Sequence, residues 1–311
     1  MRVALIGIVG CGRVGVSTAI QVAMKGLGDL VLIDIIQGLP QGEALDLSHM
    51  ASILGIDVEI TGSNDYRDLS GADLVIVTAG VVRKADMTRM DLLTKNASIV
   101  SDVSDKIREY APGSRVIMVT NPLDVMTYVA LRRTGFERER VMGFSGLLDF
   151  GRFRYLVARE LGVSRSSITG PIIGEHGDSM VLLPRLTTVL GEPLTSLLPS
   201  ERIRELVERT RRAGAEVISL KGWSASHAPG AGAALMAEAI IRDTNAVVPV
   251  SLYLKGEYGV EGVCVVVPAV LGWSGVKRVI ELSLTESERS EFLRSVEVVR
   301  QAQQAVDQLI H

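Results

Sequence analysis

The chain has 311 residues, of which 47% are hydrophobic and 22% are charged, as in ordinary globular proteins. This length exceeds the usual size of one hydrophobic core, so we expect two domains that share a cleft. The formal net charge of −3 offers no basic surface for phosphate backbones, which argues against nucleic acid and favours a small-molecule partner.

The two cysteines, Cys11 and Cys264, have neither the number nor the spacing of a disulfide framework or a zinc site, so no metal is expected. The first apolar stretch, Val3–Ile6, is shorter than the core of a signal peptide. No apolar run approaches the roughly 20 residues that span a bilayer. We therefore expect a cytoplasmic protein without a membrane partner.

The first half of the chain alternates short apolar runs with longer amphipathic stretches, a pattern typical of a parallel sheet flanked by helices. The predicted strands are Val3–Val9, Leu30–Asp34, Val58–Thr61, Leu74–Thr78 and Arg115–Val119. The predicted helices between them are Val14–Lys25, Gly42–Leu54, Arg89–Tyr110 and Leu123–Arg133. This pattern predicts an α/β fold with a doubly wound parallel sheet, the Rossmann arrangement, over residues 1–143.

Glycines at a characteristic spacing follow the first strand and open the first helix, in the segment Gly10, Cys11, Gly12, Arg13, Val14 and Gly15. Such a loop lets the backbone approach a pyrophosphate at a helix N-terminus. Asp34 ends the second strand, where a carboxylate accepts hydrogen bonds from ribose hydroxyls and repels a 2′-phosphate. These residues predict an NAD site. The alternative is a plain turn followed by a solvated aspartate.

A polar segment follows the fourth strand and precedes a predicted capping box formed by Thr88 and Asp91. If this segment closes as a lid, Arg83 and Arg89 would approach a substrate while water is excluded. Asn96 lies two turns after Arg89 on the same helix face.

Val119, Thr120 and Asn121 lie at the carboxyl end of the fifth strand, and the carboxyl ends of parallel strands border the ligand crevice. We expect Asn121 to contact both cofactor and substrate. The alternative is a common Asn-Pro turn.

Beyond Gly143 the alternation stops, and helices mix with strand pairs such as Val247–Leu254 and Gly262–Pro268. We expect a second, α+β domain over residues 144–311. Thr285 and Glu288 predict a capping box that opens a helix running to Ile310.

Asp149 and Arg152 are three positions apart and project from one face of a helix, either as a surface ion pair or as a clamp for a substrate carboxylate. Of the four histidines, His176 is the preferred acid–base because flanking glycines leave room for a ligand. His49 and His311 are expected to be structural or solvated, and His227 is placed in a loop. Asp149 is the predicted partner of His176. A proton donor, a carboxylate clamp and NAD together suit hydride transfer on a 2-hydroxy acid.

In this order the motifs resemble the lactate/malate dehydrogenase family over nearly the whole chain. The segments that carry the resemblance are Val81–Leu92, Thr120–Tyr128, Leu147–Arg152 and Ile172–Ser179. The resemblance implies an oxidoreductase in which His176 accepts the substrate proton and Asp149 orients it. It also implies that Arg152 holds the C1 carboxylate and Arg89 polarises the carbonyl, while Asn96, Asn121 and the Val119–Thr120 backbone contact NAD. It implies a homo-oligomer, a tetramer or a dimer.

Within the family an arginine at the position of Arg83 goes with malate and a glutamine with lactate, so the resemblance implies malate as substrate. Ala225 is small where lactate enzymes carry threonine. Lys84-Ala85-Asp86 replaces the usual Lys-Pro-Gly, which puts lid stiffness in doubt, and Ser226-His227 replaces two tyrosines. The alternatives are a lactate or broad 2-hydroxy acid dehydrogenase and a non-catalytic NAD-binding protein.

Overall fold

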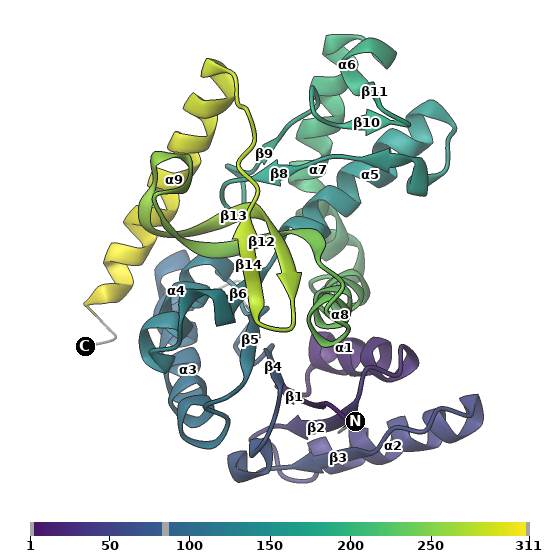
Figure 1. Ribbon diagram of the computed structural model, residues 1–311, viewed down its shortest axis with the longest axis vertical. Helices are drawn as coiled ribbons and strands as arrows, with labels where there is room; N and C mark the ends of the chain where they lie inside the picture. Colours follow the sequence, from purple (N-terminus) through teal and green to yellow (C-terminus); the bar gives the residue numbers. More distant parts are fainter. Residues whose placement is uncertain (1–2, 83–86, 309–311) are drawn as a thin grey trace.

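The structure is a computed structural model that describes residues 3–82 and 87–308 (Figure 1). In this described part, one large sheet of nine strands runs through the molecule in the order β14-β13-β12-β6-β5-β4-β1-β2-β3. Helices cover both faces of the sheet, and α9 lies along one side of the molecule (Figure 1).

The parallel half of the sheet has the strand order that doubly wound dinucleotide-binding folds share. Its strands are β1 (Leu5–Val9), β2 (Asp29–Ile33), β3 (Ile60–Ser63), β4 (Leu74–Val77), β5 (Arg115–Met118) and β6 (Val141–Phe144). Its helices are α1 (Arg13–Met24), α2 (Leu39–Leu54), α3 (Arg89–Tyr110) and α4 (Leu123–Thr134), with 3-10 turns η1 (Tyr66–Leu69) and η2 (Arg138–Arg140). The predicted α/β fold is confirmed.

The sheet continues beyond β6 through three antiparallel strands, β12 (Ala246–Lys255), β13 (Glu261–Gly272) and β14 (Gly275–Val279). The sequence prediction missed β6, which pairs parallel with β5 and antiparallel with β12. All four of its residues are buried, so no alternation of polar and apolar residues marks the strand.

The rest of the second half consists of helices and short strands. Its helices are α5 (Gly146–Leu161), α6 (Leu194–Leu197), α7 (Ser200–Lys221), α8 (His227–Ile241) and α9 (Glu286–Asp307), with 3-10 turns η3 (Arg165–Ser167) and η4 (Glu257–Gly259). Short strands form two small sheets: β7 (Ile168–Thr169), β8 (Ile172–Ile173), β9 (Val181–Leu182), β10 (Thr188–Val189) and β11 (Glu192–Pro193). The mixture of helices and antiparallel strands confirms the predicted α+β character.

Both predicted capping boxes are present. The Thr88 hydroxyl accepts from the Asp91 amide at 3.0 Å, and the Asp91 carboxylate accepts from the Thr88 amide at 3.0 Å. The same reciprocal bonds join Thr285 and Glu288 at the start of α9. Each box satisfies two backbone donors that a helix start leaves unpaired, which fixes where α3 and α9 begin.

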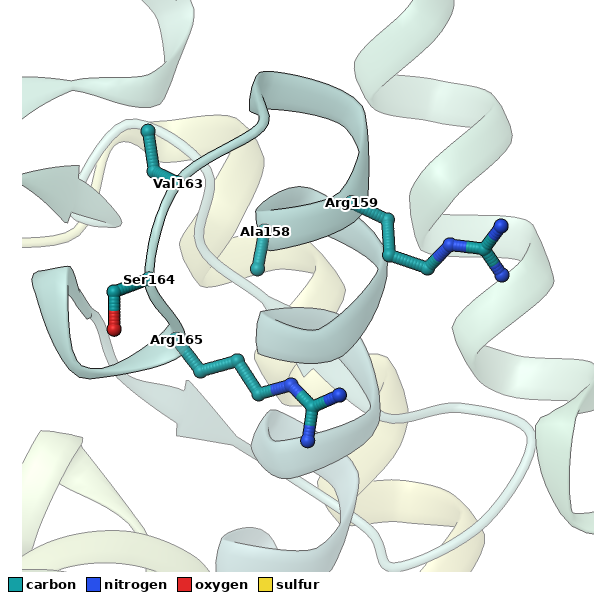
Figure 2. A pocket seen from close by; sticks show the side chains of 5 residues that line it. All are labelled: Ala158, Arg159, Val163, Ser164 and Arg165. Atoms are coloured by element: carbon teal, nitrogen blue, oxygen red, sulfur yellow. The ribbon is translucent and has the colours of Figure 1, made fainter.

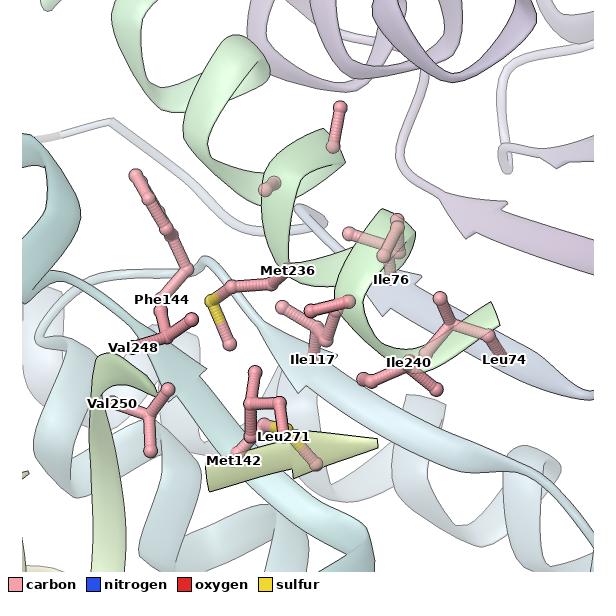
Figure 3. Packing of buried hydrophobic residues seen from close by; sticks show 14 of the residues in the cluster. Leu74, Ile76, Ile117, Met142, Phe144, Met236, Ile240, Val248, Val250 and Leu271 are labelled. Atoms are coloured by element: carbon pink, nitrogen blue, oxygen red, sulfur yellow. The ribbon is translucent and has the colours of Figure 1, made fainter. Parts of the chain in front are cut away.

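One hydrophobic cluster contains buried residues from both halves of the chain. Figure 3 shows Met236 and Ile240 of α8 among the strand residues Ile76, Ile117 and Met142. Helices α1 and α8 lie side by side (Figure 1). Within residues 3–82 and 87–308, no helix combines the length and apolar character needed to cross a membrane.

Candidate active site

The glycine-rich loop lies between β1 and α1, and each of its glycines meets a different requirement. Gly10 has φ +102°, a left-handed conformation that favours glycine. A Cβ on Gly15 would lie 1.8 Å from the Gly10 carbonyl oxygen, so only glycine lets α1 approach the strand. A Cβ on Gly12 would meet no heavy atom within 4 Å, which leaves open space above the first turn of α1. The loop therefore fits a pyrophosphate.

Asp34 follows β2 and lies against this loop. Its carboxylate accepts from the Cys11 amide at 2.7 Å and from the Ile36 amide at 3.0 Å. Burial, together with the negative charges of Asp34 and Glu43, raises the pKa of the Cys11 thiol to about 12, so this cysteine is a neutral packing residue. Asp34 is half-buried beside the loop, a place from which a carboxylate can reach a ribose.

Arg13, the first residue of α1, stacks on a residue far away in the sequence. Its guanidinium lies 4.0 Å from the centre of the Trp223 ring, in the segment between α7 and α8. This cation–π contact connects the glycine-rich loop with the segment that carries Ala225.

Hydrogen bonds join the ends of β4 and β5 to α3. The Asn96 side chain is buried, accepts from the Val81 amide at 2.8 Å and donates to the Asn121 carbonyl at 2.7 Å. The Thr120 hydroxyl donates to the Ala79 carbonyl at 2.7 Å. Asn121 itself is exposed, so its side chain is accessible.

His176 lies in the loop between β8 and β9, where its ring meets α5. The Nδ1 atom of His176 lies 2.6 Å from Oδ2 of Asp149, and Nη1 of Arg152 donates to Oδ1 of the same carboxylate at 3.0 Å. Asp149 is 1% exposed, whereas the side chains of His176 and Arg152 are 16% and 19% exposed. The carboxylate is thus shielded from water, and the two residues that it holds remain accessible.

The surroundings of His176 favour its protonated form. Burial by itself lowers the pKa of the imidazole, but the charge and hydrogen bond of Asp149 and the charge of Asp124 outweigh burial and the opposing charge of Arg152. The net result is a pKa above the ordinary value, as suits a group that takes up a proton.

Two buried residues near His176 were not singled out in the sequence. Asp124, in the first turn of α4, accepts from the His176 amide at 2.7 Å, and the Ser251 hydroxyl of β12 donates to the same carboxylate at 2.6 Å. The signal was an acidic residue just after the Asn121-Pro122 turn, which by itself indicates only a helix start.

The His176 loop is also held by α9 and β13. The Ser295 hydroxyl of α9 accepts from the Glu175 amide at 2.7 Å, and Gly174 exchanges two backbone hydrogen bonds with Val266. Gly174 has φ +92°, and a Cβ there would lie 2.5 Å from the Ser295 hydroxyl oxygen. The first residues of the loop are therefore held by contacts with both α9 and β13.

Some predicted residues lie elsewhere or outside the described part. Arg83 lies outside the described residues, as does the side chain of Arg89, although Arg89 is the first residue of α3. His227 was expected in a loop, but it is the first residue of α8. His49 is exposed on α2, in agreement with its predicted helical position.

A hollow of about 460 Å³ at the end of α5 does not belong to this site. Figure 2 shows that its lining residues are Ala158, Arg159, Val163, Ser164 and Arg165. None of these is a carboxylate or an imidazole, and the guanidinium groups of Arg159 and Arg165 both contact Tyr155. Among residues 3–82 and 87–308, no group of His, Cys, Asp and Glu side chains is arranged to hold a metal ion.

Comparisons with known proteins agree over nearly the whole chain. Residues 1–143 match the family model described as lactate/malate dehydrogenase, NAD binding domain, and residues 147–309 match lactate/malate dehydrogenase, alpha/beta C-terminal domain. The malate dehydrogenase of Pyrobaculum aerophilum is 52% identical over 95% of this chain and 96% of its own length.

Two solved structures illustrate the range of similar folds. The malate dehydrogenase from Aeropyrum pernix has a TM-score of 0.96 and 47% identity, covering 98% of this chain and 100% of that one. The lactate dehydrogenase from Cryptosporidium parvum, in complex with lactic acid and β-nicotinamide adenine dinucleotide, has a TM-score of 0.95 and 38% identity, covering 99% of each chain. This chain therefore belongs to the lactate/malate dehydrogenase family.

Proposed function

We propose that this protein is an NAD-dependent malate dehydrogenase that interconverts (S)-malate and oxaloacetate. The observation that carries the chemistry is the buried Asp149 carboxylate, which binds His176 and Arg152 on its two oxygens. The relatives named malate dehydrogenase support the choice of substrate.

NAD, when bound at the glycine-rich loop and Asp34, supplies the acceptor for the hydride on C2 of malate. Asp149 holds the Nδ1 side of His176, so Nε2 is the atom that takes the proton from the substrate hydroxyl. The Asp149 carboxylate then stabilises the imidazolium that forms. Arg152 shares this carboxylate through Nη1, and its remaining N–H groups are suited to hold the C1 carboxylate of the substrate.

The second carboxylate of malate requires a further cation, and this role is proposed for Arg83. A pyruvate methyl beside a buried arginine would leave that charge unpaired, at a cost of about 3–5 kcal/mol. Arg89 is proposed to polarise the carbonyl, and Asn121 to contact both cofactor and substrate. Asn96, Thr120 and Val119 are proposed to shape the cofactor site.

The test of the chemistry is NAD⁺ reduction by malate, followed as absorbance of NADH. We expect turnover in the wild type and a loss of several orders of magnitude in His176→Asn, because no proton acceptor remains. His49→Asn is the matched control, since His49 is exposed on α2, and it should retain full turnover. Undiminished turnover in His176→Asn would reject His176 as the proton acceptor.

The remaining proposals concern the cofactor, the location and the assembly of the protein. We propose NAD over NADP because Asp34 would repel a 2′-phosphate, and equal rates with both cofactors would contradict this.

We also propose a cytoplasmic homo-oligomer, a tetramer or a dimer, that acts in the tricarboxylic acid cycle. Exposed apolar side chains on α2, namely Leu45, Ile53 and Leu54, support an oligomer, which light scattering would test. The division into residues 1–143 and 144–311 stays a prediction, and its boundary falls within β6.

A further inference from the structure

Asp124 is a buried carboxylate to which the proposed chemistry assigns no role. It lies in the first turn of α4 and is 3% exposed. Its Oδ2 atom accepts from the backbone amide of His176 at 2.7 Å, and its Oδ1 atom accepts from the hydroxyl of the fully buried Ser251 at 2.6 Å. Both oxygens therefore have fixed partners.

His176 is consequently held from two directions by two carboxylates. Asp149 of α5 binds the ring at Nδ1, whereas Asp124 of α4 binds the main chain of the same residue. A main-chain hydrogen bond fixes the Cα position, and a ring hydrogen bond fixes the rotation of the side chain. Together they define where Nε2 lies.

The charge of Asp124 acts on His176 within a small group of titratable neighbours. Asp149 and Arg152 approach His176 from α5, Glu175 precedes it in the loop, and Cys264 of β13 faces Asp124. Burial raises the pKa of the Cys264 thiol well above its ordinary value, so this group stays neutral. The negative charge on Asp124 favours the protonated form of His176, while Arg152 opposes it.

Asp124 keeps this charge at neutral pH. Burial raises the pKa of its carboxyl to about 6, and the hydrogen bonds from Ser251 and from the His176 amide, with the charge of His176, limit the rise. Above this pH the carboxylate is ionised beside an imidazole that must accept a proton.

We propose that Asp124 is a positioning residue for proton transfer: its carboxylate fixes the main chain at His176, and its negative charge favours the imidazolium that forms when the substrate hydroxyl loses its proton. This inference rests on the proposed function only in naming the substrate. The effect on His176 itself exists without any ligand.

The test is the Asp124→Asn variant, because asparagine has nearly the same shape but carries no charge. Its Oδ1 atom can accept from the His176 amide, and its Nδ2 atom can donate to the Ser251 hydroxyl oxygen, so the second hydrogen bond is kept with its direction reversed. With only four histidines in the chain, isotope labelling of histidine lets NMR follow the titration of His176 in the ligand-free protein. We expect the pKa of His176 to fall by roughly one pH unit, as for the loss of one nearby charge. An unchanged titration in folded Asp124→Asn would overturn the proposal.

The matched control is Asp105→Asn. Asp105 is a partly buried aspartate whose partners are Arg108 and Arg133, not the His176 loop. This variant loses the same charge, and the pKa of His176 should stay as in the wild type. A shift as large as that in Asp124→Asn would also overturn the proposal, because it would reflect net charge rather than position.

A kinetic measurement separates this inference from the proposed function. In the wild type the pH profile of kcat/KM for malate should show a proton acceptor whose apparent pKa falls in Asp124→Asn, while the KM for NAD⁺ stays the same. If the wild type does not oxidise malate, the proposed function fails, and the NMR titration still decides the role of Asp124.

Ser251→Ala provides a second test if Asp124→Asn does not fold. Loss of the hydroxyl removes a hydrogen bond that favours the ionised carboxylate, so Asp124 should be less charged near pH 6 to 7. We expect the pKa of His176 to fall by a smaller amount than in Asp124→Asn. A titration of His176 identical to the wild type would contradict the proposal.

Discussion

Arg83, which lies outside the residues that the structure describes, is proposed to decide which acid the site prefers. Arg83→Gln removes the cation that the second carboxylate of oxaloacetate requires. We expect oxaloacetate reduction to fall by several orders of magnitude and pyruvate reduction to rise. Steady-state kinetics with NADH measure both, and a nearly constant ratio of the two rates would mean that Arg83 does not face the substrate.

Asp124 should show a conflict between stability and function. Its folded pKa of about 6 lies above the ordinary value of 3.8, so the group stabilises the fold fully below pH 3.8, and this contribution is lost as the pH rises through 6. Above pH 6 the ionised carboxylate therefore opposes folding. Neutral asparagine avoids this cost.

We therefore expect Asp124→Asn to have a higher Tm than the wild type at pH 8 and nearly the same Tm at pH 4. Thermal unfolding followed by circular dichroism at the two pH values tests this. A variant with a lower Tm than the wild type at pH 8, or with the same change in Tm at both pH values, would show that the ionised carboxylate does not destabilise the fold.

At the scale of elements, two glycines in the turn from β1 into α1 allow the effect of a substitution on folding to be measured separately from its effect on cofactor binding. Gly15→Ala should destabilise the fold by about 1–3 kcal/mol, because its Cβ meets the Gly10 carbonyl oxygen. Gly12→Ala should leave the Tm unchanged, since its Cβ meets no heavy atom, yet weaken NADH binding about tenfold or more by occupying the space of the pyrophosphate.

Gly42→Ala on α2 is the matched control, because its Cβ also lies in open space. Calorimetry gives the Tm and the Kd for NADH of all three variants. Wild-type affinity in Gly12→Ala would contradict the placement of the cofactor above the first turn of α1.

Elements governed by local rules could be predicted from the sequence. The glycine loop and the capping boxes at Thr88 and Thr285 depend on residues only a few positions apart. The bounds of strands were predicted less well, and the second strand of the predicted pair, Gly262–Pro268, is one example. In the structure β13 continues to Gly272. Pro268 lies opposite Pro249 of β12, so the two residues that lack a backbone N–H face each other in the sheet.

Contacts that join distant parts of the chain could not be predicted in this way. Asp124 is 52 positions from His176 and 127 from Ser251, and nothing in the sequence near Asp124 indicates either partner. The stacking of Arg13 on Trp223 is equally non-local. By contrast, the proximity of Asp149 and His176 was predicted because the chemistry itself requires an orienting carboxylate.

At the scale of the whole molecule, one sheet and one hydrophobic cluster span both halves of the chain. The two halves are also joined by hydrogen bonds. The Asn96 side chain donates to the Asn121 carbonyl, and Asp124, three residues after Asn121, accepts from the His176 amide. The proposed cofactor residues and the proposed proton acceptor are thus held by the same core, which suits a reaction that needs both in fixed relation.

The central claim is that this fold acts on a dicarboxylic acid. The most direct measurement is the ratio of kcat/KM for oxaloacetate to that for pyruvate, with NADH, in the wild-type protein at neutral pH. We predict a large preference for oxaloacetate, because the site is proposed to hold two carboxylates. A preference for pyruvate, or equal values for the two acids, would contradict the account.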